Sequence, residues 1–161
     1  MSLPAFDPAG ALRALVAYKV RFVVIGGLAG RLWGSPTVTN DLDICYSREP
    51  GNLVRLAAVL VELEARLRGV DEDLPFIIDA ETLAAGDSFT FVTTAGNLDV
   101  LATPTGTQGF DGLVRAATEM DLGIATVLVV DVEDLIRMKR AAGRPKDLIE
   151  VEVLTALRDE L

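Results

Sequence analysis

The sequence predicts an α/β (α+β) fold in which helices flank a mixed β-sheet and the C-terminal segment is helical. Two observations support this prediction. Apolar, strand-like runs alternate with helical patterns along the chain, and two neighbouring runs are typical of an antiparallel hairpin. The chain has 161 residues, of which 50% are hydrophobic. This is enough to form the core of a single domain over residues 1–161.

The N-terminal part alternates between helix and strand. The spacing of apolar residues predicts helices over Pro8–Tyr18 and Leu28–Trp33. Apolar runs predict strands over Arg21–Gly27 and Asp41–Tyr46.

The most regular pattern is a stripe of leucines within Asn52–Leu67, which predicts a long helix. Two Glu–Arg pairs, Glu62/Arg66 and Glu64/Arg68, have the four-residue spacing that stabilises a helix.

The C-terminal part is expected to contain a hairpin and two final helices. Residues 75–79 are expected to form a short strand, residues 88–103 a hairpin with its turn at an Ala-Gly pair, and residues 125–131 a further strand. Asp131 is expected to cap a helix that runs to Ala142, and Pro145 suits the first turn of the last helix.

Composition excludes several classes of function. The net charge of −9 argues against a broad nucleic-acid-coating surface, because affinity for polyanions comes mainly from Lys and Arg. The chain has no histidine, so a histidine base and His-based zinc sites are excluded. Cys45 has no second cysteine to pair with. Together with the lack of a signal-like N-terminus or a long apolar run, this leads us to expect a cytoplasmic protein without a membrane segment.

The positive charge is concentrated in one segment. Five of the 15 Lys and Arg residues lie within residues 137–146. This local patch suits a small anion such as a nucleotide better than a long duplex.

Gly26 and Gly27 follow the first predicted strand. At a junction of strand and helix, backbone N–H groups can approach a phosphate closely. The stretch GGLAG has neither the G-x-G-x-x-G motif of dinucleotide folds nor the G-K-[ST] of a P-loop. On their own, these glycines indicate only a tight turn.

Asp41 and Asp43 alternate with apolar residues on a predicted strand, so both side chains point to one face. Two such carboxylates can converge on one or two divalent cations, which would cancel their repulsion. Alternatively, Asp41 caps a loop and Asp43 lies at a solvated strand edge. The glycine pair shortly upstream favours the metal site.

A metal site of this kind needs a third carboxylate from a neighbouring strand. Asp99 is the first candidate, because it too alternates with apolar residues, and Asp79 is the second, although its position is more typical of a turn. Lys139 interrupts the apolar stripe of its helix. Its ammonium either reaches water along the core edge or points inward to a phosphate. The nearby Arg144 and Lys146 favour the phosphate.

These motifs, in this order, resemble the minimal nucleotidyltransferases of the DNA polymerase β superfamily, and most closely those that act as toxins in abortive-infection and toxin–antitoxin systems. The matching stretches are FVVIGGLAGRLWG…TVTNDLDI, LDVL and EDLIRMKRAAGRPKDLIEVEVL. The resemblance implies a nucleotidyltransferase-like fold and transfer of NMP from an NTP, with release of pyrophosphate. It also implies two Mg²⁺ ions, a tRNA or protein hydroxyl as acceptor, and an antitoxin protein as a partner.

The resemblance further implies roles for individual residues. The metal ligands would be Asp41, Asp43 and Asp99, and Asp99 would also help to activate the acceptor hydroxyl. The residues implied to bind the nucleotide, ATP or another NTP, are Gly26, Gly27, Thr39, Lys139, Arg144, Lys146 and Asp147.

Three positions differ from the common family pattern. Gly27 stands where many members have Ser, Thr37 where many have Arg, and Glu150 where Asp is usual. These differences motivate a second hypothesis, a catalytically weak or inactive member that binds a nucleotide or a partner protein. A third, a Rossmann-type dinucleotide-binding enzyme, is disfavoured by the missing glycine motif and the paired aspartates.

Overall fold

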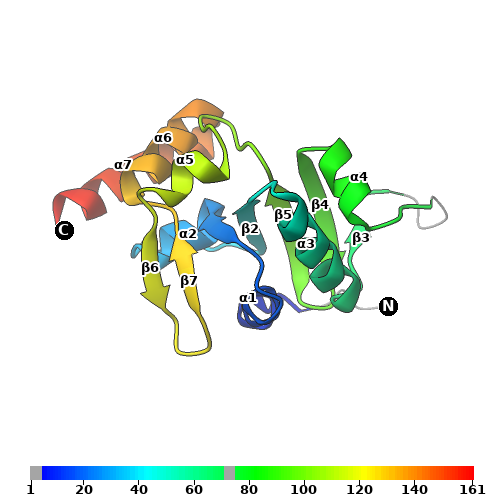
Figure 1. The fold of residues 1–161 in the computed structure, drawn as a ribbon. Helices are drawn as coiled ribbons and strands as arrows, with labels where there is room; N and C mark the ends of the chain where they lie inside the picture. Colours follow the sequence, from blue (N-terminus) through cyan, green and yellow to red (C-terminus); the bar gives the residue numbers. More distant parts are fainter. Residues whose placement is uncertain (1–4, 71–74) are drawn as a thin grey trace.

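The computed structural model describes residues 5–70 and 75–161 (Figure 1). Its strands are β1 (Phe22–Ile25), β2 (Asp41–Tyr46), β3 (Arg66–Leu67), β4 (Ser88–Thr93), β5 (Gly96–Leu101), β6 (Thr118–Asp121) and β7 (Thr126–Val129). Its helices are α1 (Pro8–Ala17), α2 (Gly26–Leu32), α3 (Pro50–Glu62), α4 (Ala80–Ala85), α5 (Phe110–Val114), α6 (Val132–Ala142) and α7 (Pro145–Asp159). The N-terminal stretch was expected to lack a signal peptide. Its first four residues lie outside the described residues.

The strands of this part of the chain form one mixed sheet in the order β3-β4-β5-β2-β1-β7-β6. Strand β2 pairs in parallel with β5 and antiparallel with β1. The pairs β4–β5 and β6–β7 are antiparallel hairpins. The expected α/β fold, with a mixed sheet, flanking helices and a helical C-terminal segment, is confirmed.

Strands β2 and β5 lie in the interior of the sheet, between the two ends of the molecule. Figure 1 shows β3, β4 and α4 at one end and the β6–β7 hairpin with α5, α6 and α7 at the other. Helix α6 packs against both α2 and α7. Strands β2 and β5 therefore lie between elements that come from distant parts of the sequence.

The alternating pattern of β2 and β5 fixes which side chains face the core. Four apolar side chains, each at most 1% exposed, enter it: Leu42, Ile44, Leu98 and Val100. Burying each of them stabilises the fold by about 1.5–3 kcal/mol. Successive residues of a strand face opposite sides, so the polar residues between them lie on the other face, and a register shift by one residue would bury carboxylates.

The helix predicted over Asn52–Leu67 is wrong at its C-terminal end. Helix α3 ends at Glu62, and Glu64 adopts a left-handed conformation with φ 52°. The chain reverses there, and Arg66 and Leu67 pair with β4 as strand β3. Residues 66–68 are therefore not helical, so the four-residue Glu–Arg spacing has no helix to stabilise here.

Three further differences concern short elements. The short strand expected over residues 75–79 is absent, because the chain there leads into α4, whose N-cap is Asp79. The apolar pattern of the sequence did not indicate α5 or the edge strand β6. Helix α5 packs against β1, and β6 pairs with β7. Within residues 5–70 and 75–161, no helix is both long and apolar enough to cross a membrane.

Candidate active site

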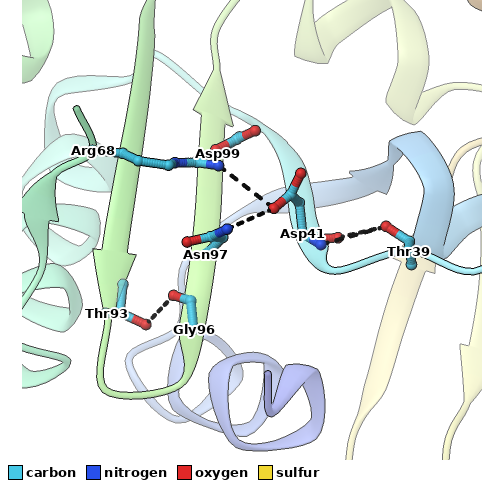
Figure 2. Close-up of polar contacts among 7 residues, drawn as sticks. All are labelled: Thr39, Asp41, Arg68, Thr93, Gly96, Asn97 and Asp99. Atoms are coloured by element: carbon cyan, nitrogen blue, oxygen red, sulfur yellow. Dashed lines mark hydrogen bonds and ion pairs between the residues drawn. The ribbon is translucent and has the colours of Figure 1, made fainter. Parts of the chain in front are cut away.

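Two parallel strands bring the three predicted metal ligands together. In the register of β2 and β5, Asp43 lies opposite Asp99 and Asp41 lies opposite Asn97. The three carboxylates therefore share one face of adjacent strands. Asn97 Nδ2 donates a hydrogen bond of 2.9 Å to Asp41 Oδ1 (Figure 2).

Asp79, the other candidate for the third carboxylate, has a different role. Its Oδ1 accepts a hydrogen bond of 2.7 Å from the backbone N–H of Thr82, which caps the N-terminus of α4. This bond lowers the pKa of the exposed Asp79 carboxyl.

The carboxylate cluster carries more negative charge than its surroundings neutralise. Burial, followed by the proximity of Asp99 and Asp41, raises the pKa of Asp43 to about 7, and Lys139 opposes this rise. Burial also raises the pKa of Asp99, against the opposing effect of Arg68. Within the described residues, Asp43 Oδ1 is buried without a hydrogen-bond partner.

Arg68 also belongs to this cluster, which the sequence pattern did not indicate. Its Nη2 forms an ion pair with Asp99 Oδ1, and its Nη1 lies 3.5 Å from Asp41 Oδ1. Figure 2 shows the side chain reaching across the hairpin towards both carboxylates. The helix predicted for this segment concealed its position. Asn97 could have been found, because it stands two residues before Asp99 on the same strand face.

The donor set fits a divalent cation. Carboxylate and amide oxygens are the ligands that Mg²⁺ prefers in proteins, and the unpartnered Asp43 Oδ1 is an oxygen available to one. In the conformation described for residues 5–70 and 75–161, no group of three acidic or cysteine side chains forms a ready-made metal site. Arg68 contacts two of the three carboxylates in that conformation.

The two glycines lie directly against this cluster. Gly26 begins α2 with φ 69°, and a Cβ added there would lie 2.9 Å from Asp43 Cγ and still closer to Asp43 Oδ2. A Cβ added at Gly27 would lie 2.9 Å from Thr39 Oγ1. That hydroxyl donates a hydrogen bond of 3.2 Å to the carbonyl of Asp41 (Figure 2). The glycine pair therefore allows the backbone of the turn to approach the start of β2.

Lys139 and Asp147 connect helices α6 and α7 at the edge of the site. Lys139 Nζ lies 3.8 Å from Asp147 Oδ1, and the lysine is close enough to Asp43 to lower its pKa. Asp147, only 1% exposed, also accepts hydrogen bonds of 2.6 and 3.2 Å from the Arg144 side chain. The hydrogen bonds to Arg144 lower the pKa of Asp147.

The rest of the basic segment does not gather at one point. Lys146 is exposed on the first turn of α7, and the Arg144 side chain is 60% exposed. Arg137 forms an ion pair with Asp134 on its own helix. Of the residues predicted to bind the nucleotide, the structure brings Gly26, Gly27, Thr39 and Lys139 near the carboxylates, whereas Arg144 and Asp147 bind each other beside them.

Two of the positions that differ from the family pattern are in direct contact. Thr37 Oγ1 donates a hydrogen bond of 2.7 Å to Glu150 Oε2, and Ser35 Oγ lies 3.2 Å from the same hydroxyl. Glu150 is 7% exposed and also contacts α2, where a Cβ added at Gly30 would lie 3.1 Å from Glu150 Oε1. Glu150 therefore ties α7 to the loop that leads into β2.

We expect the substitution Thr37→Val to destabilise the protein by about 1–2 kcal/mol, because it leaves the buried Glu150 carboxylate without this donor. The matched variant Thr37→Ser keeps the hydroxyl and should retain wild-type stability. Urea denaturation of the three proteins measures the difference. Equal midpoints for Thr37→Val and wild type would contradict this role of Thr37.

Comparison with solved structures assigns this architecture to a known class: the protein has a minimal nucleotidyltransferase fold. One similar structure is that of the lincosamide antibiotic adenylyltransferase LnuA with bound lincomycin. It matches with a TM-score of 0.64 and 12% identity, over 96% of this chain and 99% of that one. A protein from Thermotoga maritima assigned to the nucleotidyltransferases matches with a TM-score of 0.52 and 16% identity, over 98% of each chain. No protein-family model and no curated protein matches the sequence.

These structures confirm the fold that the resemblance implied. At this level of identity the likeness concerns the fold alone. The roles of individual residues and the closer resemblance to toxins stay predictions.

Proposed function

We propose that this protein is a Mg²⁺-dependent nucleotidyltransferase that moves NMP from an NTP to a hydroxyl group of an acceptor. The observation that supports this most is the convergence of Asp41, Asp43 and Asp99 from adjacent parallel strands, beside a glycine turn and within a nucleotidyltransferase fold.

Each part of the site would contribute to one step. Asp41, Asp43 and Asp99 would hold Mg²⁺, which when bound neutralises the triphosphate and makes the α-phosphorus more electrophilic. The Gly26–Gly27 turn would approach the phosphate oxygens through backbone N–H groups, and Lys139 would offset their charge. The acceptor oxygen forms a bond to the α-phosphorus as the bond to pyrophosphate breaks, and the acceptor proton leaves towards Asp99.

The chemical class of the acceptor is part of the proposal. A tRNA or protein hydroxyl is the acceptor implied by the sequence resemblance. A small molecule is a second candidate, because LnuA was solved with lincomycin bound. The net charge of −9 favours an acceptor that is not a polyanion, because like charges repel.

Labelled nucleotides provide the direct test. Purified protein is incubated with each α-labelled NTP and Mg²⁺. Separate reactions contain tRNA, cell-extract protein, or small hydroxyl compounds that include lincomycin. The control is the double variant Asp41→Asn/Asp43→Asn. We expect the wild type alone to transfer label, and to one class of acceptor.

The other outcomes separate the remaining hypotheses. If both proteins transfer no label, or the same amount, the proposed catalysis is contradicted. A non-catalytic nucleotide-binding module would still gain thermal stability with NTP and Mg²⁺, as a ligand that binds the folded state requires. If no NTP shifts the melting temperature, nucleotide binding is contradicted too. Growth arrest by the wild type but not by the double variant would support a toxin role.

A further inference from the structure

Arg68 joins the edge of the sheet to the proposed metal site. It follows β3, and its backbone N–H donates a hydrogen bond of 2.9 Å to the carbonyl of Thr90 on β4. From this anchor the side chain extends over β4 and β5 and reaches Asp99 and Asp41 (Figure 2). The backbone of Arg68 is therefore fixed by strand pairing, whereas only electrostatic contacts hold its guanidinium.

These contacts involve the same carboxylates that were proposed to hold the metal. Asp99 Oδ1 and Asp41 Oδ1 accept from the two terminal nitrogens of the guanidinium. Its Nε is buried and has no hydrogen-bond partner within the described residues. The guanidinium is thus positioned by two acidic side chains and by no other polar group of the described chain.

A guanidinium and a divalent cation cannot both contact the same carboxylate oxygens without strong repulsion. The side chain of Arg68 is only 29% exposed, so solvent screens this repulsion less than it would at an open surface. A metal ion bound by Asp41 and Asp99 therefore requires the guanidinium to move. A long, flexible side chain on a fixed backbone can do so without unfolding the sheet.

We propose that Arg68 is a positioning residue of this site: in the metal-free protein its guanidinium holds Asp41 and Asp99 together, and a divalent cation binds by displacing it. This inference rests on the proposed function, because it assumes that these carboxylates bind metal. Arg68 then has two effects. It keeps neighbouring strands that carry like charges assembled without metal, and it lowers the affinity of the site for metal.

The experiment measures Mn²⁺ binding directly, by electron paramagnetic resonance of the free ion, in the whole protein without nucleotide. We expect Arg68→Gln to bind Mn²⁺ about tenfold more tightly than the wild type, since the metal no longer competes with a guanidinium. Metal-free Arg68→Gln should melt at a lower temperature than the wild type, and Mn²⁺ should raise its melting temperature by a larger amount. Arg68→Lys keeps the charge but loses the forked geometry, so its affinity should lie between the two.

Arg66→Gln is the matched control, because Arg66 lies two residues earlier in the sequence, at the start of β3, and the variant has the same change in charge. If Arg66→Gln tightens Mn²⁺ binding as much as Arg68→Gln does, the effect is long-range and displacement is overturned. Equal affinity in the wild type and both Arg68 variants also overturns it, while the metal site itself stands. If no protein binds Mn²⁺, both the displacement and the proposed metal site are overturned. If metal-free Arg68→Gln does not fold, the Arg68→Lys affinity decides.

Discussion

Asp43→Asn is expected to reduce nucleotidyl transfer by roughly 10³-fold or more, because metal stabilisation of charge in the transition state is worth several kcal/mol. Asp43 is the central carboxylate of the cluster: it pairs in register with Asp99, contacts the Gly26 turn, and has a buried oxygen without a partner. An amide keeps the shape of the side chain but loses its charge. The measurement is the initial rate of label transfer at saturating Mg²⁺.

The same variant should make the metal-free protein more stable at neutral pH. Burial and the neighbouring carboxylates raise the pKa of Asp43 in the folded protein to about 7, above its ordinary value of 3.8. A raised pKa means that the folded state binds the proton more tightly than the unfolded chain does. The stabilisation that this proton provides is therefore complete below the pKa of Asp43 in the unfolded chain, and it is lost as the pH rises through 7. Between pH 3.8 and pH 7, the free energy of unfolding of the wild type should fall by up to about 1.4 kcal/mol per pH unit relative to that of Asp43→Asn.

Urea denaturation of both proteins from pH 5 to pH 8.5, with chelator present, measures this difference. Excess Mg²⁺ should reduce it, because an ion bound to the wild type stabilises the folded state. Asp79→Asn is the control, since it changes an exposed carboxylate that caps α4 and should leave label transfer unchanged. A fully active Asp43→Asn variant, or an inactive Asp79→Asn variant, would contradict the assignment of the site.

The sequence was sufficient to predict the part of the site that depends on local alternation. Asp41, Asp43 and Asp99 alternate with apolar residues, so burial of the apolar face leaves only one orientation for the carboxylates. The resemblance implied that the glycine pair binds the phosphates, and the structure places this pair against Asp43 and Thr39. The pairing of Asp43 with Asp99 depends on the parallel contact between β2 and β5, which joins distant parts of the chain and was only an expectation.

The parts that the sequence did not predict depend on tertiary contacts. The leucine spacing of α3 continues past the point at which the chain reverses at Glu64, and strand pairing with β4 overrides helical propensity there. Arg68 therefore appeared to be one half of a helical ion pair. Thr37 and Glu150 appeared to be two unrelated differences from the family pattern, because their contact spans most of the chain.

Gly26→Ala is expected to reduce both stability and transfer, because Gly26 combines a left-handed backbone with close packing on Asp43. Its φ of 69° is unfavourable for a residue with a Cβ and costs about 1–2 kcal/mol. The added Cβ would also lie 2.9 Å from Asp43 Cγ and force that side chain to shift. Together we expect a loss of about 2–4 kcal/mol. The displaced carboxylate should slow transfer by about 10²-fold.

Gly123→Ala separates these two causes. Gly123 has a similar φ of 83°, but a Cβ added there meets nothing within 4 Å. The Gly123→Ala variant should therefore lose only the stability that the unfavourable backbone conformation costs, and it should keep full activity. The double variant Gly26→Ala/Asp43→Ala lacks Asp43 Oδ2 and Cγ, the two atoms closest to the added Cβ, and keeps only the Cβ of residue 43, 3.0 Å away. Its stability loss should therefore be smaller than the sum of the single losses. Full additivity, or equal losses in Gly26→Ala and Gly123→Ala, would mean that Gly26 is required for its backbone conformation alone and not for the approach of the turn to Asp43.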